Sequence, residues 1–384
     1  MVIYTGSFHA FTEMGKSYAA SGWTGMASGN QNKTGIIALT LLQLMTIFSH
    51  AIFRRYTFEL FYYTHFLYVG FVITVMLHAK VSMYFVLPGL ILHFADKVYR
   101  FFVSRVRYRD AHLIGHKILP GRVLRLTIQP SAVPAHAKLH HRPPASATNP
   151  FPFIPGQYIF LCVPKLGRLQ WHPFSISSAG GRSDFSFDVH IKDSGYWTAQ
   201  LAKVIQQTRK ARTALPILIE GPYGGPVIEM WEDANIAIFI AGGIGITAFI
   251  GVLTALSIKL TQHAPICLQR LHLIWIIRHE EQYTWFGREL LDLHERIAKL
   301  PSMFRVRIDV FVTQPTHPLQ LAPSFYRGRP DLKTILPQAV AKARGNVRIG
   351  ICGPKPMIEQ CADITCNLSR KDLFISTHIE HFDF

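Results

Sequence analysis

The sequence has few cysteines, and no recognisable motif pairs them. Its five cysteines show neither CxxC pairing nor the spacing of a zinc site. No CxxCH motif occurs, so any haem would be held by side-chain ligands alone. We expect the cysteines of the C-terminal half to be free thiols in a reducing compartment. The first residues also lack the charged region and cleavage site of a secretory signal peptide.

Acidic residues are scarce as well. Asp and Glu number 23 against 40 Lys and Arg, which gives the 384-residue chain a formal net charge of +17. Nucleic-acid binding is one interpretation of such a charge. We discount it because the basic residues form no single block. Many flank apolar segments, which suits membrane topology, and others occupy positions where phosphates would bind.

Apolar residues are plentiful, at 49% of the chain with a mean hydropathy of +0.19, and they concentrate before Val103. Three apolar segments stand out, at 35–53, 58–79 and 84–102. Each is about as long as a helix that crosses a hydrocarbon layer of roughly 30 Å. The sequence therefore predicts three membrane spans, and a soluble helical bundle is the less favoured alternative.

Basic residues at the ends of these segments orient the spans. Arg54 and Arg55 follow the first segment, and a basic cluster at 97–109 follows the third. Both groups should lie on the cytosolic side. The first and third spans then run inward, and the second runs outward.

The second segment carries His65 and His78. Thirteen helical steps separate them by roughly 20 Å along the axis, a spacing that suits two haems stacked across a bilayer. On an ideal helix the two rings are about 140° out of phase, so a bend, a π-bulge or offset haem planes would be needed. We interpret His50 and His93, on the other spans, as packing or polar-contact residues.

After the spans, the pattern becomes that of a multidomain soluble module. Residues 104–128 alternate as strands with a turn, and 129–150 is a Pro-, Ala- and His-rich inserted loop. We place domain boundaries at 1–105 for the membrane part, 106–228 for an antiparallel β-barrel and 229–384 for an α/β domain with a parallel sheet.

One stretch organises the β-rich domain. An apolar strand at 158–163 follows a Pro-Gly turn, and a second short strand carries His172, Pro173, Phe174 and Ser175. Such a strand can present an aromatic ring and a hydroxyl to a flat ligand. A glycine turn at 193–198 then opens a helix, and its backbone N–H groups form a natural diphosphate site.

The α/β domain contains a strand, a glycine-rich turn and a helix. An apolar strand at 235–241 precedes Gly242, Gly243, Gly245 and Thr247, a pattern that differs from GxGxxG. Arg278 follows the next strand, where its guanidinium would grip the 2′-phosphate of NADPH. A plain surface salt bridge is an equally good interpretation of Arg278.

Taken in order, these segments resemble the ferric reductase and NADPH oxidase family, whose soluble part is ferredoxin-reductase-like. The resemblance implies that Phe174 lies against the isoalloxazine of FAD, Ser175 reaches its N5 edge and His172 lies near the diphosphate. It implies further FAD contacts at Gly195, Trp197, Thr198, Gly221, Pro222 and Tyr223.

The same resemblance implies a site for NADPH. Gly242 to Thr247 match the family's Gly-Gly-x-Gly-Ile-Thr segment, although many members have Pro where this chain has Ala248. Arg278 and Arg329 favour NADPH over NADH. Cys352, Gly353 and Pro354 match the family's segment beside the nicotinamide. Glu380 and Phe382 match its C-terminal Glu-x-Phe, which covers the flavin. A terminal strand that merely closes the sheet is the alternative for the last two.

In the membrane part, residues 56–66 resemble the family's fifth helix, which bears the first haem-ligating histidine. The family has six spans, and its third helix supplies the opposite ligands. Here only the tail of a third helix is present, with His9 as the outer ligand partnering His78. We therefore expect an N-terminally truncated product or partial gene model that binds at most one haem b well.

The expected function is electron transfer from cytosolic NADPH through FAD and haem to an external ferric or cupric chelate. The first alternative is an NADPH oxidase that makes superoxide, because such an enzyme has every motif named above. A truncated, non-enzymatic remnant that binds flavin and joins a full-length subunit is a second alternative, and a haem-free soluble flavodiaphorase lies between them. We expect an integral protein of the plasma membrane in contact with lipid, no nucleic-acid partner, and we leave a homo-oligomer open.

Overall fold

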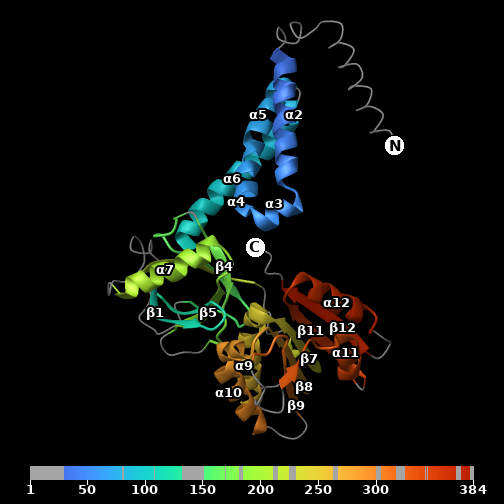
Figure 1. Ribbon diagram of the computed structural model, residues 1–384. Coiled ribbons are helices and arrows are strands. Elements are labelled where there is room, and N and C mark those ends of the chain that lie inside the picture. The colour runs from blue at the N-terminus through green and yellow to red at the C-terminus, as the bar shows by residue number, and fades with distance from the viewer. Residues whose placement is uncertain are drawn as a thin grey trace. The chain divides into compact units, whose positions relative to one another are not determined.

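The computed structural model describes residues 30–79, 82–107, 109–131, 151–168, 170–180, 185–210, 215–224, 231–262, 267–299, 304–316, 325–341, 343, 345–368 and 373–380. The chain divides into two compact units, Met1–Phe102 and Val103–Phe384, and each is described by itself (Figure 1). His9, Phe382 and residues 132–150 of the expected inserted loop lie outside the described residues.

The first unit is helical. Its elements are α2 (Asn30–Phe48), α3 (Ala51–Tyr56), α4 (Phe58–His65), α5 (Leu67–His78) and α6 (Ser82–Arg107), the last of which continues into the second unit. Helices α2 and α5 lie side by side (Figure 1). Glycines allow this close approach, because an added Cβ at Gly70 would lie 3.3 Å from Leu41, and one at Gly35 would lie 2.8 Å from the His78 ring.

The second predicted span is interrupted beside its first histidine. Helix α4 ends at His65 and α5 begins at Leu67. Between them, the N–H of Phe66 bonds to the carbonyl of Tyr63, and the N–H of Val69 bonds to the carbonyl of Phe66. These bonds skip three residues rather than four, which tightens the helix locally. This tightened turn lies between the two histidines; it is neither a π-bulge nor the offset of haem planes that the phase argument considered.

The first predicted span, 35–53, is also interrupted. Helix α2 ends at Phe48, and His50 begins α3 by accepting a hydrogen bond from the N–H of Ile52 on its Nδ1, at 3.5 Å. His50 is therefore a helix-capping residue.

Among the described helices, two are long and apolar enough to cross a membrane. Leu60–His78 contains no buried residue, whereas Gly243–Thr261 is mostly buried in the second unit and belongs to its core. The apolar part of α2, Lys33–Phe48, is shorter. Of the three predicted spans, the second thus meets this criterion in the structure.

The second unit begins with an antiparallel six-stranded sheet in the order β4-β3-β6-β1-β2-β5. Helix α7 (Tyr196–Lys210) packs its apolar side, including Leu201 and Ile205, onto the core beneath this sheet. The strands β1 to β6 and α7 form the lobe in which the sequence predicts the FAD site, and we call it the flavin lobe for that reason. The strands are β1 (Arg109–Leu119), β2 (Val123–Pro130), β3 (Tyr158–Cys162), β4 (His172–Ser175), β5 (Phe187–Lys192) and β6 (Pro216–Tyr223).

A parallel six-stranded sheet in the order β10-β9-β8-β7-β11-β12 forms the nucleotide lobe. All strand pairs are parallel, so the carboxyl ends share one edge. The strands are β7 (Ile236–Gly242), β8 (Arg270–Ile277), β9 (Arg305–Val312), β10 (Phe325–Arg327), β11 (Gly345–Cys352) and β12 (Leu373–Glu380). The helices are η2 (Gly243–Ile246), α9 (Thr247–Thr261), η3 (Glu280–Trp285), α10 (Gly287–Ala298), α11 (Leu332–Val340) and α12 (Lys355–Cys366).

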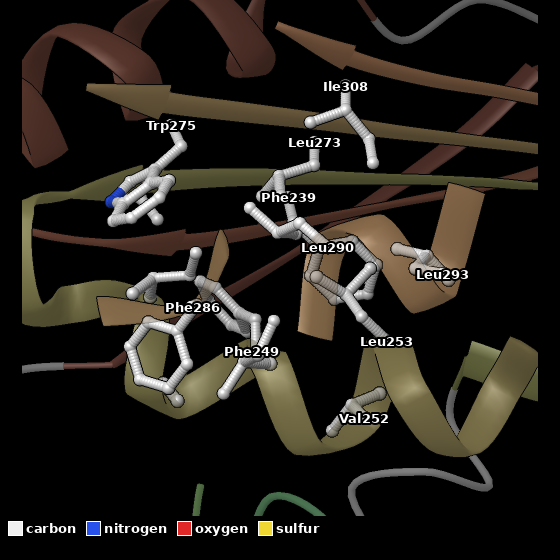
Figure 2. Close-up of a cluster of buried hydrophobic side chains, with 14 of the residues drawn as sticks. Phe239, Phe249, Val252, Leu253, Leu273, Trp275, Phe286, Leu290, Leu293 and Ile308 are labelled. Carbon is white, nitrogen blue, oxygen red and sulfur yellow. The ribbon is translucent and has the colours of Figure 1, made fainter. Parts of the chain in front are cut away.

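Each face of the parallel sheet has its own core. Helices α9 and α10 cover one face, where Phe239, Phe249 and Leu273 meet Leu290 and Leu293 (Figure 2). Helices α11 and α12 supply the apolar side chains of the other core. Strands buried on both faces read as continuous apolar runs, which is why the sequence predicts this sheet well.

The two lobes share a core. Leu119 and Val123 of the flavin lobe belong to the same buried cluster as Trp285 and Phe286 of the nucleotide lobe. The indole N–H of Trp285 also donates to the carbonyl of Pro120 at 2.7 Å. The lobes are therefore joined by apolar burial and a directed hydrogen bond.

Candidate functional site

The short strand β4 presents His172 and Phe174 on one side, because alternate residues of a strand point the same way. Trp197, from the first turn of α7, covers both. Its ring centroid lies 4.0 Å from that of His172 and 6.1 Å from that of Phe174, and it is nearly parallel to Phe174, at 24°. The structure thus brings together three predicted FAD residues from two separate elements.

Two buried nitrogens in this cluster lack partners. Neither Nε2 of His172 nor Nε1 of Trp197 has a hydrogen-bond partner among the described residues. Burial lowers the pKa of His172, so its imidazole is neutral at physiological pH. An unsatisfied buried donor costs about 1–3 kcal/mol, which a ligand rich in acceptor oxygens would recover. The phosphate and ribityl oxygens of FAD fit this requirement.

Removing the indole N–H tests this fit. We expect Trp197→Phe to weaken FAD binding by about tenfold, because one buried hydrogen bond of about 1 kcal/mol is lost together with part of the ring contact. Flavin fluorescence titration of the purified chain measures the dissociation constant. Trp231→Phe is the matched control, since Trp231 Nε1 is also buried without a partner but lies in the nucleotide lobe. Equal dissociation constants for both variants would contradict the assignment.

Ser175 lies on the opposite side of β4 from Phe174. It pairs with Tyr158 of β3, which in turn pairs with Tyr223 of β6, so the three form a row across the sheet. The rings of Tyr158 and Tyr223 are 5.8 Å apart, and the Tyr223 hydroxyl donates to Glu220 at 2.5 Å. Because β4 is an edge strand, a ligand along that edge can reach both Phe174 and Ser175.

The Gly221-Pro222-Tyr223 segment forms the end of strand β6. A register shift between Tyr158 and Phe160 accommodates Gly221, which has a left-handed φ of 134°. The irregular ladder lets the strand continue past the glycine. Sequence reasoning overlooked Tyr158 and Glu220. Their only signal was the alternation of the strand.

The first turn of α7 differs from expectation. The N–H groups of Ser194 and Gly195 donate to the hydroxyl of Thr198, at 3.1 and 3.0 Å, so the amide of Gly195 is not free. The same hydroxyl donates to the carboxylate of Asp193 at 3.3 Å. Thr198 therefore caps this helix. Gly195 remains exposed with open space around its Cα, so a ligand can still approach its backbone.

The predicted nucleotide glycines and the Cys352-Gly353-Pro354 segment meet at the carboxyl ends of two adjacent strands, β7 and β11. A Cβ added to Gly245 would lie 2.5 Å from the carbonyl oxygen of Cys352, and one added to Gly242 would lie 2.7 Å from Pro354. The carbonyl of Gly243 accepts the Trp275 N–H at 2.9 Å. At Gly242 and Gly245 a side chain does not fit, and the bare backbone of this glycine cradle permits the close approach that a diphosphate requires.

Cys352 lies at the base of this cradle, opposite Glu380 in the strand register. Burial, together with the charge of Glu380, raises the pKa of Cys352 to about 12, so it remains a neutral thiol. Glu380 is held by Nε2 of His378 at 2.8 Å. Thr247, predicted as a nucleotide contact, donates its hydroxyl to the carbonyl of Ile244 at 2.9 Å.

Both predicted arginines lie at the carboxyl edge of the parallel sheet. Arg278 directly follows β8, and Arg329 lies two residues after β10. One strand separates β8 from β10, which places their ends about 10 Å apart. Both side chains are exposed, and among the described residues neither forms an ion pair with a carboxylate. This favours a ligand role over the surface salt bridge.

Each of the two predicted haem histidines is the last residue of a helix, His65 of α4 and His78 of α5. His65 is exposed, and its ring lies 5.4 Å from that of Phe61. His78 is also exposed and contacts α2, with its Nδ1 3.5 Å from the hydroxyl of Thr34. Across the described residues, no three His, Cys, Asp or Glu side chains gather as a metal site.

Three family models match the chain. Residues 1–76 match the "Ferric reductase like transmembrane component", residues 138–227 match the "FAD-binding domain" and residues 235–321 match the "Ferric reductase NAD binding domain". The first match identifies an integral membrane protein. The other two correspond to the flavin and nucleotide lobes.

Curated relatives agree with these matches. Ferric reduction oxidase 4 of Arabidopsis thaliana is 30% identical over 74% of this chain, and Ferric reduction oxidase 8, mitochondrial, of the same plant is 29% identical over 77%. The chain spans 37% of the length of each. Dual oxidase 1 of Homo sapiens is 24% identical over 91% of this chain and 23% of that protein.

Among solved structures, the flavohemoglobin of Malassezia yamatoensis with bound FAD and heme aligns with a TM-score of 0.50. It is 15% identical and covers 89% of this chain and 79% of that chain. Together with the two sheets described above, these matches confirm the predicted fold class: transmembrane helices followed by a ferredoxin-reductase-like module.

Proposed function

Because the chain belongs to the ferric reductase and NADPH oxidase family, we propose that it transfers electrons from cytosolic NADPH, through FAD and haem b, to an external ferric or cupric chelate. The shared core of the two lobes is the observation that carries this proposal. It joins the lobe that carries the flavin strand β4 to the lobe that carries the glycine cradle of β7 and β11, within one compact unit. Hydride transfer requires such a fixed relation between two bound cofactors.

The flavin lobe supplies alignment. Phe174 and Trp197 provide the aromatic surface, His172 and Trp197 offer buried polar nitrogens, and Ser175 borders the edge that would meet the flavin N5. Gly221 to Tyr223 border the same site, and Gly195 leaves room for the diphosphate. FAD, when bound, would accept the hydride and pass the electrons on singly, and that chemistry belongs to the cofactor.

The nucleotide lobe supplies orientation and charge. Gly242, Gly243 and Gly245 would hold the NADPH diphosphate, and Arg278 and Arg329 its 2′-phosphate. Cys352, Gly353 and Pro354 would border the nicotinamide. The neutral Cys352 thiol adds no charge beside the transferred hydride, and His378 orients the carboxylate of Glu380.

The membrane half of the proposal concerns haem. We propose His78 and His9 as the two ligands of one haem b. His65 is the only ligand proposed for a second haem, so at most one haem binds well. The proposed location is the plasma membrane with the two lobes in the cytosol. The helical unit is proposed to contact lipid, and the oligomeric state of the chain is a separate measurement.

A reductase assay on the full chain in lipid nanodiscs tests the function. With FAD and NADPH, ferric citrate should yield ferrous iron that a ferrous chelator traps. Superoxide formed in place of ferrous iron would favour the oxidase, which the dual oxidase relatives share. If the chain does not reduce even a soluble dye with NADPH, the result favours the alternative of a non-enzymatic remnant.

The arginine assignment has its own test. We expect Arg278→Ala to raise the KM for NADPH by about 10- to 100-fold, because charge-assisted hydrogen bonds of about 1.5–3 kcal/mol are lost. The KM for NADH should change little. Arg305→Ala is the control, since Arg305 is exposed at the amino end of β9, on the far edge of the sheet. If Arg278→Ala raises the KM for NADPH and the KM for NADH equally, Arg278 does not bind the 2′-phosphate.

A further inference from the structure

The loops that follow β8 and β9 interlock around Arg278. The side chain of Gln314, from the β9 loop, accepts a hydrogen bond from Nε of Arg278 at 2.7 Å. The backbone reinforces this contact, because the N–H of Gln314 donates to the carbonyl of Arg278 at 2.8 Å. The N–H of Arg278 is in turn held by the side chain of Gln282 at 2.7 Å.

This arrangement uses only one of the five N–H donors of the guanidinium. The described residues provide no partner for the two terminal nitrogens, Nη1 and Nη2, of Arg278. A guanidinium fixed through Nε presents those nitrogens as a planar fork, the geometry that matches two oxygens of a phosphate. Because Gln314 is neutral, it orients the fork without neutralising its charge.

A second contact keeps an acidic side chain away from the fork. Glu280 lies two residues after Arg278 in the sequence. Its carboxylate instead accepts hydrogen bonds from the backbone N–H of Thr316, at 3.0 and 3.2 Å, and from the Thr316 hydroxyl at 2.5 Å. Thr316 also lies on the β9 loop. A carboxylate beside the fork would both compete for Arg278 and repel a phosphate.

We infer that Gln314 and Thr316 are positioning residues that determine selectivity for the 2′-phosphate of the nucleotide. Gln314 aims the terminal nitrogens of Arg278, and Thr316 holds the carboxylate of Glu280 away from them. The inference rests on the proposed function, because it concerns the NADPH site named there. The recognised group is a phosphomonoester dianion on a ribose, the feature that separates NADPH from NADH.

The sharpest test is Gln314→Glu in the full chain, which keeps the side-chain length and places a negative charge on Nε of Arg278. The ratio of kcat/KM for NADPH to kcat/KM for NADH should fall about 30-fold or more, because the introduced carboxylate pairs with the arginine and opposes a dianion. Thr316→Val, of the same shape, should lower that ratio about threefold to tenfold by releasing one bond to Glu280. Gln338→Glu is the control, because Gln338 is an exposed residue of α11.

A binding measurement makes the test independent of turnover. Calorimetry with 2′,5′-ADP and with 5′-ADP should show that wild-type chain prefers the first and that Gln314→Glu loses this preference. Thermal unfolding of each variant, within a few degrees of wild type, shows that the lobe is folded. Loss of both ligands would indicate damage to the lobe and would overturn the role in selectivity.

The outcomes separate the two proposals. If wild-type chain does not discriminate the two ADP probes or the two nicotinamide nucleotides, the proposed NADPH function fails. If wild type prefers the 2′-phosphate and Arg278→Ala removes that preference while Gln314→Glu retains it, the function stands and the present inference is overturned.

Discussion

Gly245→Ala is expected to abolish the reduction of FAD by NADPH, lowering its rate by about 100-fold or more. The added Cβ would lie 2.5 Å from the carbonyl oxygen of Cys352 and 2.9 Å from its carbonyl carbon. Both atoms belong to the backbone of β11, which is hydrogen-bonded on both sides to β7 and β12, so it cannot yield easily. The cradle must open instead, and a displacement of about 1 Å costs on the order of 10²-fold in rate. Anaerobic stopped-flow absorbance at the flavin band measures the effect.

Gly243→Ala is the matched comparison. A Cβ at this position meets nothing within 4 Å, so the substitution adds only the strain of a positive φ of 54°, about 1–2 kcal/mol. We expect its rate to remain within about tenfold of wild type. FAD content should be unchanged in both variants, because the flavin strand lies in the other lobe. Similar rates for the two variants would show that the packing of Gly245 against Cys352 does not set the nucleotide geometry.

The second large effect is acid sensitivity caused by His190. This residue is buried between the lobes, with its Nδ1 2.8 Å from the hydroxyl of Ser177 and its ring 4.3 Å from that of Phe286. Burial, aided by the positive charge of Arg125 and opposed by Asp188, lowers the pKa of His190 to about 3. Its Nε2 has no hydrogen-bond partner among the described residues, so the structure offers nothing to stabilise an added proton.

The direction of the pH dependence follows from these values. In the unfolded chain His190 has a pKa of about 6.5, so between pH 6.5 and 3 the unfolded state binds the extra proton. The free energy of unfolding is therefore highest above pH 6.5 and falls as the pH decreases. The slope approaches about 1.4 kcal/mol per pH unit, which makes a loss of about 2 kcal/mol by pH 5 and about 5 kcal/mol at full extent.

Denaturant unfolding of the full chain between pH 7.5 and 5 measures this effect. His190→Asn, which keeps a polar group near Ser177, should be less stable at pH 7.5 but lose less stability on acidification. His294→Asn is the control, because His294 is exposed on α10. Parallel pH profiles for wild type and His190→Asn would show that another group is responsible.

Much of the fold follows from local pattern. The apolar run of β7, the apolar strand at β3 and the glycine-rich turn at Gly242 each indicate an element in a stretch of about ten residues, and the structure contains all three. The flavin strand β4 also lies where the His-Pro-Phe-Ser stretch predicts it. Such signals survive because burial on one or both faces dictates residue type along the element itself.

The site was less predictable. The sequence indicated that the rings of His65 and His78 point in different directions around an ideal helix. It did not indicate that the helix is interrupted at Phe66, because that interruption arises from local backbone hydrogen bonds. It predicted a free amide at Gly195, whereas the hydroxyl of Thr198 occupies it. It also left the role of Arg278 open, because the residues that bond to it and to Glu280, Gln314 and Thr316, lie in the loop after a different strand.

The hydrophobic pattern by itself determined the order of the parts, apolar helices followed by a β-rich lobe and an α/β lobe, and the resemblance of the motifs to a known family assigned flavin and nucleotide to these lobes. Only the tertiary structure decided which polar groups find each other. Trp197 lies over His172, Cys352 closes against Gly245, and Gln314 rather than Glu280 holds Arg278. The reason is physical: burial acts on each segment separately, whereas hydrogen bonds and close contacts depend on the positions of segments distant in the chain.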